Sequence, residues 1–234
     1  MEHPTDTAAK DLPELILASR SPRRRELLAA AGYRFRVMPP PGAAETGQQP
    51  GESPPDLVAR LAKEKAASVV AQVAHGLKAI RKPLAPGPSP PKRGEGRVFS
   101  DRLLVLGCDT VAECDGEILG KPDDRRHARR MLETLRGRRH RVLSGLCLWE
   151  LPCGEPDVRV AITTLLMDRL SDRQIEQYLD SGAWQGKAGA FGYQDRLGWV
   201  HVTEGSESNV VGLPLETLAE MLEGRDWLRN ATGA

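Results

Sequence analysis

Short apolar runs and amphipathic stretches alternate along most of this chain, with polar or glycine-containing turns between them. A short apolar run bounded by turn residues is typical of a buried strand, and apolar positions that recur every three or four residues indicate a helix. The predicted strands are residues 15–18, 35–38, 103–107, 111–114, 117–119, 141–149, 158–166, 191–193 and 199–202. The predicted helices are residues 22–31, 56–74, 124–135, 172–181 and 214–222. Interspersed strands and helices with a few hairpins predict an α/β fold built on a mixed sheet.

Two segments stand outside this pattern. Residues 1–12 are polar and are expected to fray. Residues 76–102 carry five prolines among lysines and arginines, which predicts an exposed loop or a disordered insert rather than a helix or a central strand. A polyproline ligand for a partner is the alternative interpretation of that tract. The remainder of residues 13–228 is predicted to be one domain that the insert interrupts.

The composition is that of a globular protein with a substantial core. Hydrophobic residues make up 40% of the 234 residues and charged residues 28%, with a formal net charge of +1. A net charge near zero gives no general attraction for nucleic acid or for an anionic membrane. No apolar run approaches the 18 or so residues that cross a bilayer. The first 13 residues are polar and carry acids, unlike a secretory signal or a transit peptide, so we expect a cytoplasmic protein.

The cysteines give no sign of a metal site. Cys108 and Cys114, like Cys147 and Cys153, have five residues between them, a spacing that matches no common zinc motif. Cys108 and Cys147 lie inside apolar runs and are predicted to be small core residues. Disulfides are not expected in a reducing cytoplasm.

The junction between the first predicted strand and helix has the features of an anion site. Ser21 suits the N-cap, Pro22 suits the first helical position, and Gly32 is placed to end the helix. A strand that feeds a helix N-terminus leaves backbone N–H groups in one crevice, where they attract anions. The arginines at 23–25 are unfavourable for a helix start unless an anion compensates them, although a solvated helix face would also hold them. Neighbours on a helix diverge, so not all three can reach one ligand.

An acid and a lysine follow the apolar run at 103–107. Asp109 is expected at the carboxyl end of that strand, a common place for a magnesium ligand or a general base, and equally for an acid that only starts a turn. Lys121, after the turn at Asp115-Gly116, is a phosphate contact or a solvated turn lysine. Its surroundings are not a Walker A loop, because the spacing is one residue short and Pro122 replaces the serine or threonine.

Lys65 lies four residues after Leu61 in the helix predicted at 56–74, so it leans toward the buried side of that helix. A lysine there points to an anion in a cleft or to a side chain that snorkels to the helix edge. Residues 187–194 place glycines around a lysine, a tyrosine and a glutamine, which allows the backbone to approach a ligand closely. Several cations with one acid, and no Ser-His-Asp set, fit metal-assisted hydrolysis of a polyphosphate.

Seven segments follow one another in a fixed order: LILASRSPRRRELL, LAKEKA, GCDTV, GEILGKP, ARRMLETLRGRRHRV, KAGAFGYQ and NVVGLPL. Together they resemble the Maf family of nucleoside triphosphate pyrophosphatases, over about residues 15–222. The resemblance implies two lobes around a mixed, twisted sheet with a deep cleft, similar to the inosine triphosphate pyrophosphatases. It also implies a divalent cation, Mg²⁺ or Mn²⁺, and a homodimer.

The resemblance assigns roles to particular residues. Asp109 matches the general base that activates water for attack at the α–β linkage, and it also matches a metal ligand. Glu45 is the nearest match for the family's second metal-site acid, in a proline-rich stretch that blurs the register. The residues that match the positions discriminating among bases are Arg23, Thr110 and Gln194. Those that match the lining of the phosphate cleft are Ser19, Arg24, Lys65 and Lys121.

The resemblance is to the family branch that hydrolyses dTTP and UTP, because Asp109-Thr110 and residues 187–194 match its two markers. Modified pyrimidine nucleotides fit the same branch. Phe191 and Tyr193 replace the usual tyrosine and isoleucine, and Asp195 stands where glycine is typical, so an extra acid beside the base pocket is expected to shift selectivity.

Two other functions remain open at this point. One is a nucleotide-binding regulator of septum formation with little or no catalysis. The other is a pyrophosphatase of different base specificity, such as one for 7-methyl-GTP. A nucleic-acid binder is disfavoured by the near-neutral charge and by an aromatic content of 4%.

Overall fold

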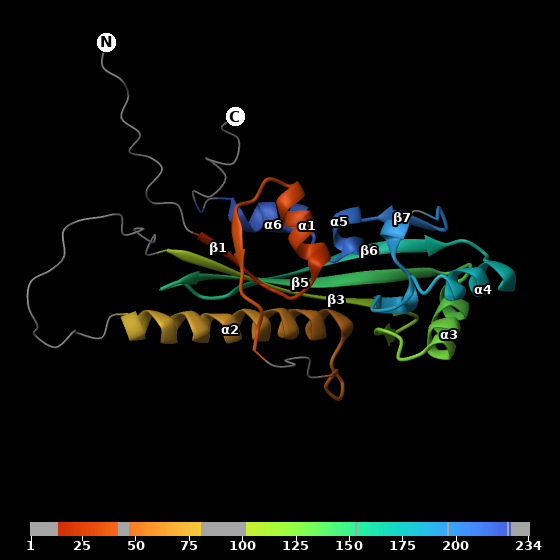
Figure 1. Ribbon diagram of the computed structural model, residues 1–234, viewed down its shortest axis with the longest axis horizontal. Helices are drawn as coiled ribbons and strands as arrows, with labels where there is room; N and C mark the ends of the chain where they lie inside the picture. The colour runs from red at the N-terminus through yellow and green to blue at the C-terminus, as the bar shows by residue number, and fades with distance from the viewer. Residues whose placement is uncertain are drawn as a thin grey trace, which may run out of the picture.

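The structure, a computed structural model, describes residues 14–41, 47–80, 102–152, 154–195, 197–223 and 225, without the side chains of 76–80. Its centre is a seven-stranded mixed sheet with helices on both faces (Figure 1). The strands are β1 (Glu14–Ala18), β2 (Phe35–Val37), β3 (Leu103–Cys114), β4 (Glu117–Leu119), β5 (Arg139–Leu151), β6 (Asp157–Met167) and β7 (Val200–Glu204). The helices are α1 (Pro22–Ala30), α2 (Pro54–Ile80), α3 (Arg125–Leu135), α4 (Asp172–Asp180), α5 (Glu207–Val211) and α6 (Leu215–Leu222).

The sheet is parallel at one edge and antiparallel elsewhere. The strand order is β2-β1-β3-β5-β6-β7, and β4 pairs with β3 outside this path. β1 runs parallel to β2 and β3, whereas β3, β5, β6 and β7 pair antiparallel in turn. β1 ends opposite Gly107, so β3 continues beyond it and leaves its next residues open on that side. The prediction of a mixed α/β sheet is therefore confirmed.

Alternate residues of the central strands pack against different helices. Leu15 and Leu17 of β1 face α1 and α6, on the upper side of the sheet in Figure 1. Ile16 and Ala18 point to the other side, where α2 lies. Burial on both faces explains why the strand reads as a continuous apolar run rather than an alternating one.

Two glycines let α2 lie directly on the sheet. A Cβ atom at Gly107 of β3 would stand 2.2 Å from the carbonyl oxygen of Ala62, and one at Gly145 of β5 would stand 2.1 Å from that of Val58. No other residue fits such an approach, because any side chain would displace the helix backbone. These contacts fix the position of α2 along β3, and with it the position of Lys65.

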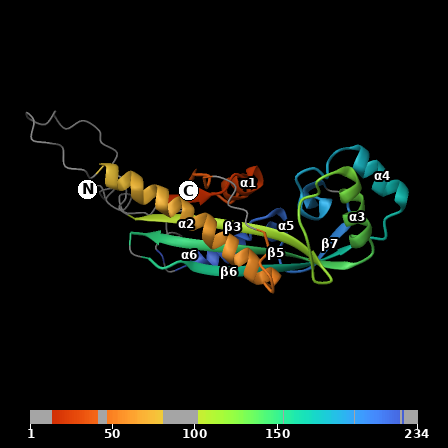
Figure 2. The ribbon, with the colours of Figure 1, turned by 90° about the horizontal axis from the view of Figure 1, so that it is seen from below.

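The apolar core is divided along the length of the sheet. At one end α3 and α4 pack on β3, β5 and β6 through residues that include Leu132, Leu135, Ile175 and Leu165. The other end holds the clusters under α1, α2 and α6 (Figure 2). This division matches the two lobes that the family resemblance implies, although one sheet runs through both.

Most predicted elements are present, with shifted ends. α2 is longer than predicted and continues to Ile80, so the proline-rich segment begins later than residue 76. The tract at 81–101 lies outside the described residues, as do residues 1–13, Glu45 and Cys153. Cys108 and Cys147 are buried core residues, as predicted.

Two predictions are wrong. The runs at 103–107 and 111–114 form one strand, so Asp109 lies inside β3, paired with Gly145, rather than at a strand end. Residues 191–193 form no strand. Phe191 and Gly192 lie between two short 3₁₀ helices, Ala188–Ala190 and Tyr193–Asp195, and Tyr193 begins the second. Just before them, Gly189 and Ala190 have positive φ angles, which a strand does not adopt. Helix α5 was not predicted.

Within the described residues, no helix is both long and apolar enough to span a bilayer.

Candidate active site

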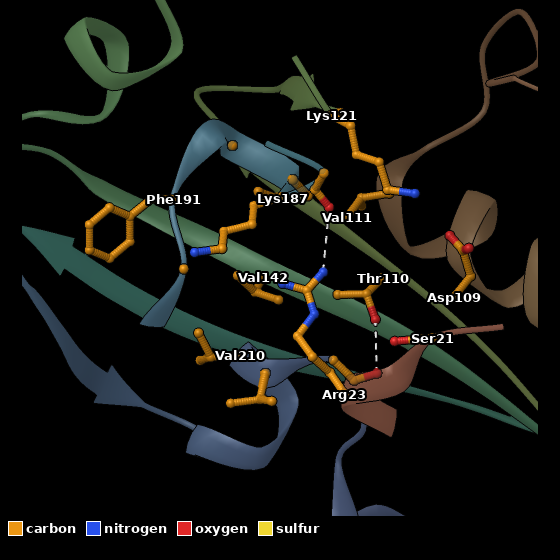
Figure 3. A pocket seen from close by; sticks show the side chains of 18 of the residues that line it. Ser21, Arg23, Asp109, Thr110, Val111, Lys121, Val142, Lys187, Phe191 and Val210 are labelled. Carbon is orange, nitrogen blue, oxygen red and sulfur yellow. Dashed lines mark hydrogen bonds between the residues drawn. The ribbon is translucent and has the colours of Figure 1, made fainter. Parts of the chain in front are cut away.

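A cavity of about 830 Å³ opens over β3 and β5, where α1, the loop after β4, the 3₁₀ segment and α5 meet (Figure 3). Six arginine and lysine residues line it: Arg20, Arg23, Arg24, Lys65, Lys121 and Lys187. Asp109 is the one aspartate or glutamate among the described lining residues. Such an excess of positive charge favours a polyanionic ligand.

The N-terminus of α1 forms one wall, as predicted. Ser21 is the N-cap: its side chain accepts a hydrogen bond from the backbone N–H of Arg24, and Pro22 begins the helix. The buried Ser19 accepts a hydrogen bond from the backbone N–H of Ser21 at 3.1 Å. The positive end of the helix dipole therefore faces the cavity, together with both serines.

Arg24 ties three parts of the molecule together at this wall. Its guanidinium donates to Ser19 Oγ at 3.2 Å, to Thr110 Oγ1 at 3.1 Å and to the carbonyl oxygen of Gly212 at 2.9 Å. Thr110 Oγ1 also lies 2.8 Å from Ser144 Oγ and 3.2 Å from the carbonyl oxygen of Gly212. Arg24 thus contributes charge to the cavity while its geometry is set by protein groups.

The three consecutive arginines diverge, as predicted from helix geometry. Arg23 and Arg24 line the cavity, whereas Arg25 is exposed. The guanidinium of Arg23 reaches across to the carbonyl oxygen of Gly186 at 3.5 Å (Figure 3). The side chain of Arg23 therefore extends from α1 to the segment that carries Lys187 and Gln194.

A buried ion pair lies on the floor of the cavity. Lys65 of α2 donates to Asp109 Oδ1 at 2.6 Å, and the two residues are 7% and 8% exposed. Lys65 leans inward as predicted, because the glycine contacts seat its helix turn on β3. Burial raises the pKa of the neighbouring Cys108, so this thiol stays protonated and is not a nucleophile.

The opposite end of the cavity is mostly apolar. Its lining includes Val142 and Leu165 of the sheet and also Phe191 and Val210. Figure 3 shows Val142, Val210 and Phe191 on the side of the cavity away from Asp109. Gln194 lines the cavity from its exposed rim. An apolar slot with a few polar groups suits a planar base.

A backbone hydrogen bond joins two lining loops. Lys121 is exposed at the mouth of the cavity, in the loop after β4. The preceding residue, Gly120, accepts a hydrogen bond at 3.0 Å from the backbone N–H of Gly189. The loop of Lys121 and the segment of Lys187 are therefore fastened to each other.

A second lysine–aspartate pair lies beside the apolar end. Lys187 Nζ is 2.5 Å and 2.6 Å from the two carboxylate oxygens of Asp195. The hydroxyl of Tyr178 also donates to Asp195, at 2.7 Å. Burial, and then the adjacent carboxylate, raise the pKa of Tyr178, so its hydroxyl keeps the proton that it donates.

The described residues supply one carboxylate for a divalent cation. Among them there is no cluster of three or more histidine, cysteine, aspartate or glutamate side chains that would hold a metal alone. Mg²⁺ does not need such a cluster, because it keeps waters and binds one or two carboxylates together with substrate phosphates. Asp109, in a cavity that favours polyphosphate, fits that kind of site.

The structure brings most of the residues of interest to one cavity. Ser19, Arg23, Arg24, Lys65, Asp109, Thr110, Lys121 and Gln194 all line it. Sequence reasoning missed the partners of these residues, Ser144 and the carbonyl of Gly212, and missed the apolar lining from Val142 and Val210. It singled out Lys187 without a partner and Asp195 as an extra acid beside the base pocket, but it did not pair the two, which the structure does.

Comparison with known proteins agrees with this geometry. Residues 14–225 match the model of the family described as Maf-like protein. The chain belongs to the Maf family. It is 49% identical over 210 residues to a dTTP/UTP pyrophosphatase of Rhodopirellula baltica, which covers 89% of this chain and 81% of that protein.

More distant Maf relatives carry the same name. A dTTP/UTP pyrophosphatase of Anaeromyxobacter dehalogenans is 39% identical over 216 residues, covering 90% of this chain and 93% of that protein. One of Syntrophomonas wolfei is 35% identical over 220 residues, covering 92% of this chain and all of that protein.

Proposed function

We propose that this Maf protein is a nucleoside triphosphate pyrophosphatase that prefers dTTP and UTP and releases the monophosphate and pyrophosphate. The observation that carries the proposal is the Lys65–Asp109 pair on the floor of a cavity lined by six arginine and lysine residues. The names of its relatives support the choice of substrate.

The cavity offers a place for each part of the substrate. The N-terminus of α1, with Ser19 and Arg24, provides donors and positive charge for phosphates, and Lys65 and Lys121 add charge from the other walls. The apolar end accepts the base and sugar. Arg23 and Gln194 flank that end, where they contact base edges in this proposal.

Thr110 contributes to specificity in a different way. Its hydroxyl already contacts Arg24, Ser144 and the carbonyl of Gly212, which occupy the donor and acceptor capacity of a threonine. We propose that it shapes the site by fixing Arg24 rather than by a new hydrogen bond to the base.

Asp109 is the proposed general base. Its carboxylate takes a proton from a water molecule whose oxygen forms the new bond to phosphorus, while the α–β phosphoanhydride bond breaks and pyrophosphate leaves. Lys65 orients the carboxylate before the reaction, because its ammonium donates to Oδ1 at 2.6 Å. Asp109, with Glu45 as a second candidate ligand, would hold a Mg²⁺ or Mn²⁺ ion together with the substrate phosphates, and the ion would supply positive charge that neutralises them.

The test is pyrophosphate release from dTTP, UTP, CTP, GTP and 7-methyl-GTP, with and without Mg²⁺ or Mn²⁺. Metal-dependent turnover led by dTTP and UTP is expected. Turnover led by 7-methyl-GTP or GTP would contradict the proposed substrate but would still support the proposed reaction. Binding without pyrophosphate release would contradict the enzyme and favour a nucleotide-binding regulator.

The expected homodimer and cytoplasmic location are further proposals. Light scattering at several protein concentrations tests the dimer, for which a constant mass of one chain is the contrary result. Fractionation of cells that express the full chain tests the location.

A further inference from the structure

We propose that Asp195 is a positioning residue that selects the base: it holds the Lys187 ammonium in the cavity wall as a fixed hydrogen-bond donor to a carbonyl oxygen of a pyrimidine. The inference rests on the proposed function, because it concerns the base of the same substrate. It is carried by a chain of contacts that runs from the cavity wall into the core.

Lys187 is held at both its stem and its tip. The ammonium lies within 2.6 Å of both oxygens of Asp195, and the two side chains are 18% and 19% exposed. The stem lies against Gly192, where a Cβ atom would stand 2.6 Å from Nζ and 2.9 Å from Cδ. A lysine held in this way does not sample the many rotamers of a surface lysine.

Asp195 is in turn held from behind. Lys187 is one of the described residues that line the cavity, whereas Asp195 is not. The Tyr178 hydroxyl, in a residue that is 4% exposed, donates to the carboxylate at 2.7 Å. The ring of Tyr178 packs against Phe191 and Trp199, with centroids 5.5 Å and 5.9 Å away. The core thus fixes the carboxylate, and the carboxylate fixes the lysine.

The lysine is turned toward the base end of the cavity. In Figure 3 its ammonium points away from Asp109 and Thr110, toward the side where Phe191 lies. An ammonium has three N–H donors and no acceptor. Two oxygens of Asp195 leave at least one N–H for a ligand, and the carboxylate offsets the charge, so Lys187 acts here as a directed donor rather than as a free cation for the triphosphate.

A fixed donor distinguishes uracil from cytosine. The C4 position of uracil or thymine carries a carbonyl oxygen, which accepts from an ammonium, whereas cytosine carries an amino group there, which only donates. Placing two donors opposite each other leaves both unpaired, and this costs more than the lost bond alone. The pair therefore favours UTP and dTTP over CTP.

The experiment compares UTP with CTP in wild type, Asp195→Asn, Asp195→Glu and Lys187→Met. The readouts are kcat and KM for pyrophosphate release, and affinities for UTP and CTP measured by calorimetry without metal. Asp172→Asn is the matched control, because it removes an exposed carboxylate from an ion pair with Arg136, both outside the cavity lining. Thermal unfolding of each variant reports stability separately.

We expect Asp195→Asn to lower the UTP/CTP ratio about tenfold, the value of one hydrogen bond to a charged group. The change should lie in KM for UTP, with kcat close to that of wild type. Asp195→Glu should recover part of the ratio, Lys187→Met should lose it, and Asp172→Asn should keep it.

An unchanged UTP/CTP ratio in Asp195→Asn, whatever its stability, would overturn the inference, as would an equal loss for both nucleotides. Failure of the proposed function looks different, because wild type would then release no pyrophosphate from any triphosphate. The calorimetric ratio still decides the role of Asp195 in that case: a preference for UTP that Asp195→Asn loses supports it, and any other result opposes it.

Discussion

The two lysine–aspartate pairs around the cavity differ in which partner is presented to the ligand. At the phosphate end, the pair of Lys65 and Asp109 is buried and both residues line the cavity. At the base end, Lys187 lines the cavity while Asp195 lies behind it. In the proposed function, the first pair presents a carboxylate for the reaction, and the second presents a hydrogen-bond donor for recognition of the base.

The supporting structures differ accordingly. Lys65 is positioned by backbone, because α2 rests on Gly107 and Gly145 of the sheet. Asp195 is positioned by a side chain, the hydroxyl of Tyr178. Identical pairs therefore acquire different roles from their surroundings, and substitutions should separate turnover from selectivity.

The largest expected effect is that of Asp109→Asn. The amide keeps the shape of the side chain but takes no proton, so kcat should fall by about 10²- to 10⁴-fold, the usual contribution of a general base. Pyrophosphate release and circular dichroism are the measurements. Full activity in a folded Asp109→Asn variant would contradict the general-base role of Asp109, which is what distinguishes the Lys65–Asp109 pair from the Lys187–Asp195 pair.

Gly107→Ala should rank second. The added methyl would meet the Ala62 carbonyl at 2.2 Å, so α2 must shift, lowering the free energy of unfolding by about 3 kcal/mol and displacing Lys65. Urea denaturation measures the loss, with Gly47→Ala as the control, since a Cβ there meets nothing within 4 Å. A variant as stable as wild type would show that α2 can move away from residue 107 without loss of stability.

Glu113→Gln tests a third carboxylate, which is buried and is not among the residues that line the cavity. Burial by itself raises the pKa of Glu113, but hydrogen bonds from Arg141 and the backbone of Gly116 outweigh it, so the pKa lies below 4.5. The stability from this lowered pKa is present above pH 4.5 and is lost as the pH falls through the folded-state value.

We expect Glu113→Gln to lower the free energy of unfolding by about 2 kcal/mol at pH 7, less at pH 3, with turnover retained. Urea denaturation at the two pH values measures it. An equal loss at both pH values would mean that ionised Glu113 gains nothing from Arg141.

Tyr178→Phe should have the smallest effect. It removes one donor from Asp195, while Lys187 still satisfies both oxygens, so the free energy of unfolding should fall by about 1 kcal/mol. Thermal unfolding measures it, beside the UTP/CTP ratio. A UTP/CTP ratio that falls as far as in Asp195→Asn would mean that Lys187 by itself does not keep the carboxylate in place once the Tyr178 hydroxyl is removed.

Much of the fold could be predicted because local signals agree with it. The apolar run before Ser19, the cap at Ser21 and the proline after it predict the strand and helix that form one wall of the cavity. The inward tilt of Lys65 followed from helical spacing alone. Each of these inferences needs only neighbours in the chain.

The failures involve contacts between distant segments. Asp109 looked like the end of a strand because a polar residue interrupts an apolar run, but pairing with β5 carries β3 through it. The segment at 191–193 was predicted to be a strand, yet Gly189 and Ala190 before it have positive φ angles and Tyr193 begins a 3₁₀ helix. The partners of Arg24 come from three elements, and no spacing rule brings those together.

The hydrogen bond from Gly189 to Gly120 has a mechanical consequence. It ties the segment that carries Lys187 to the loop that carries Lys121, so the wall beside the base cannot swing outward without breaking this bond or pulling Lys121 with it. In the proposed reaction, departure of the monophosphate and of pyrophosphate would then share a single opening motion, and the slower product would set the pace of the cycle.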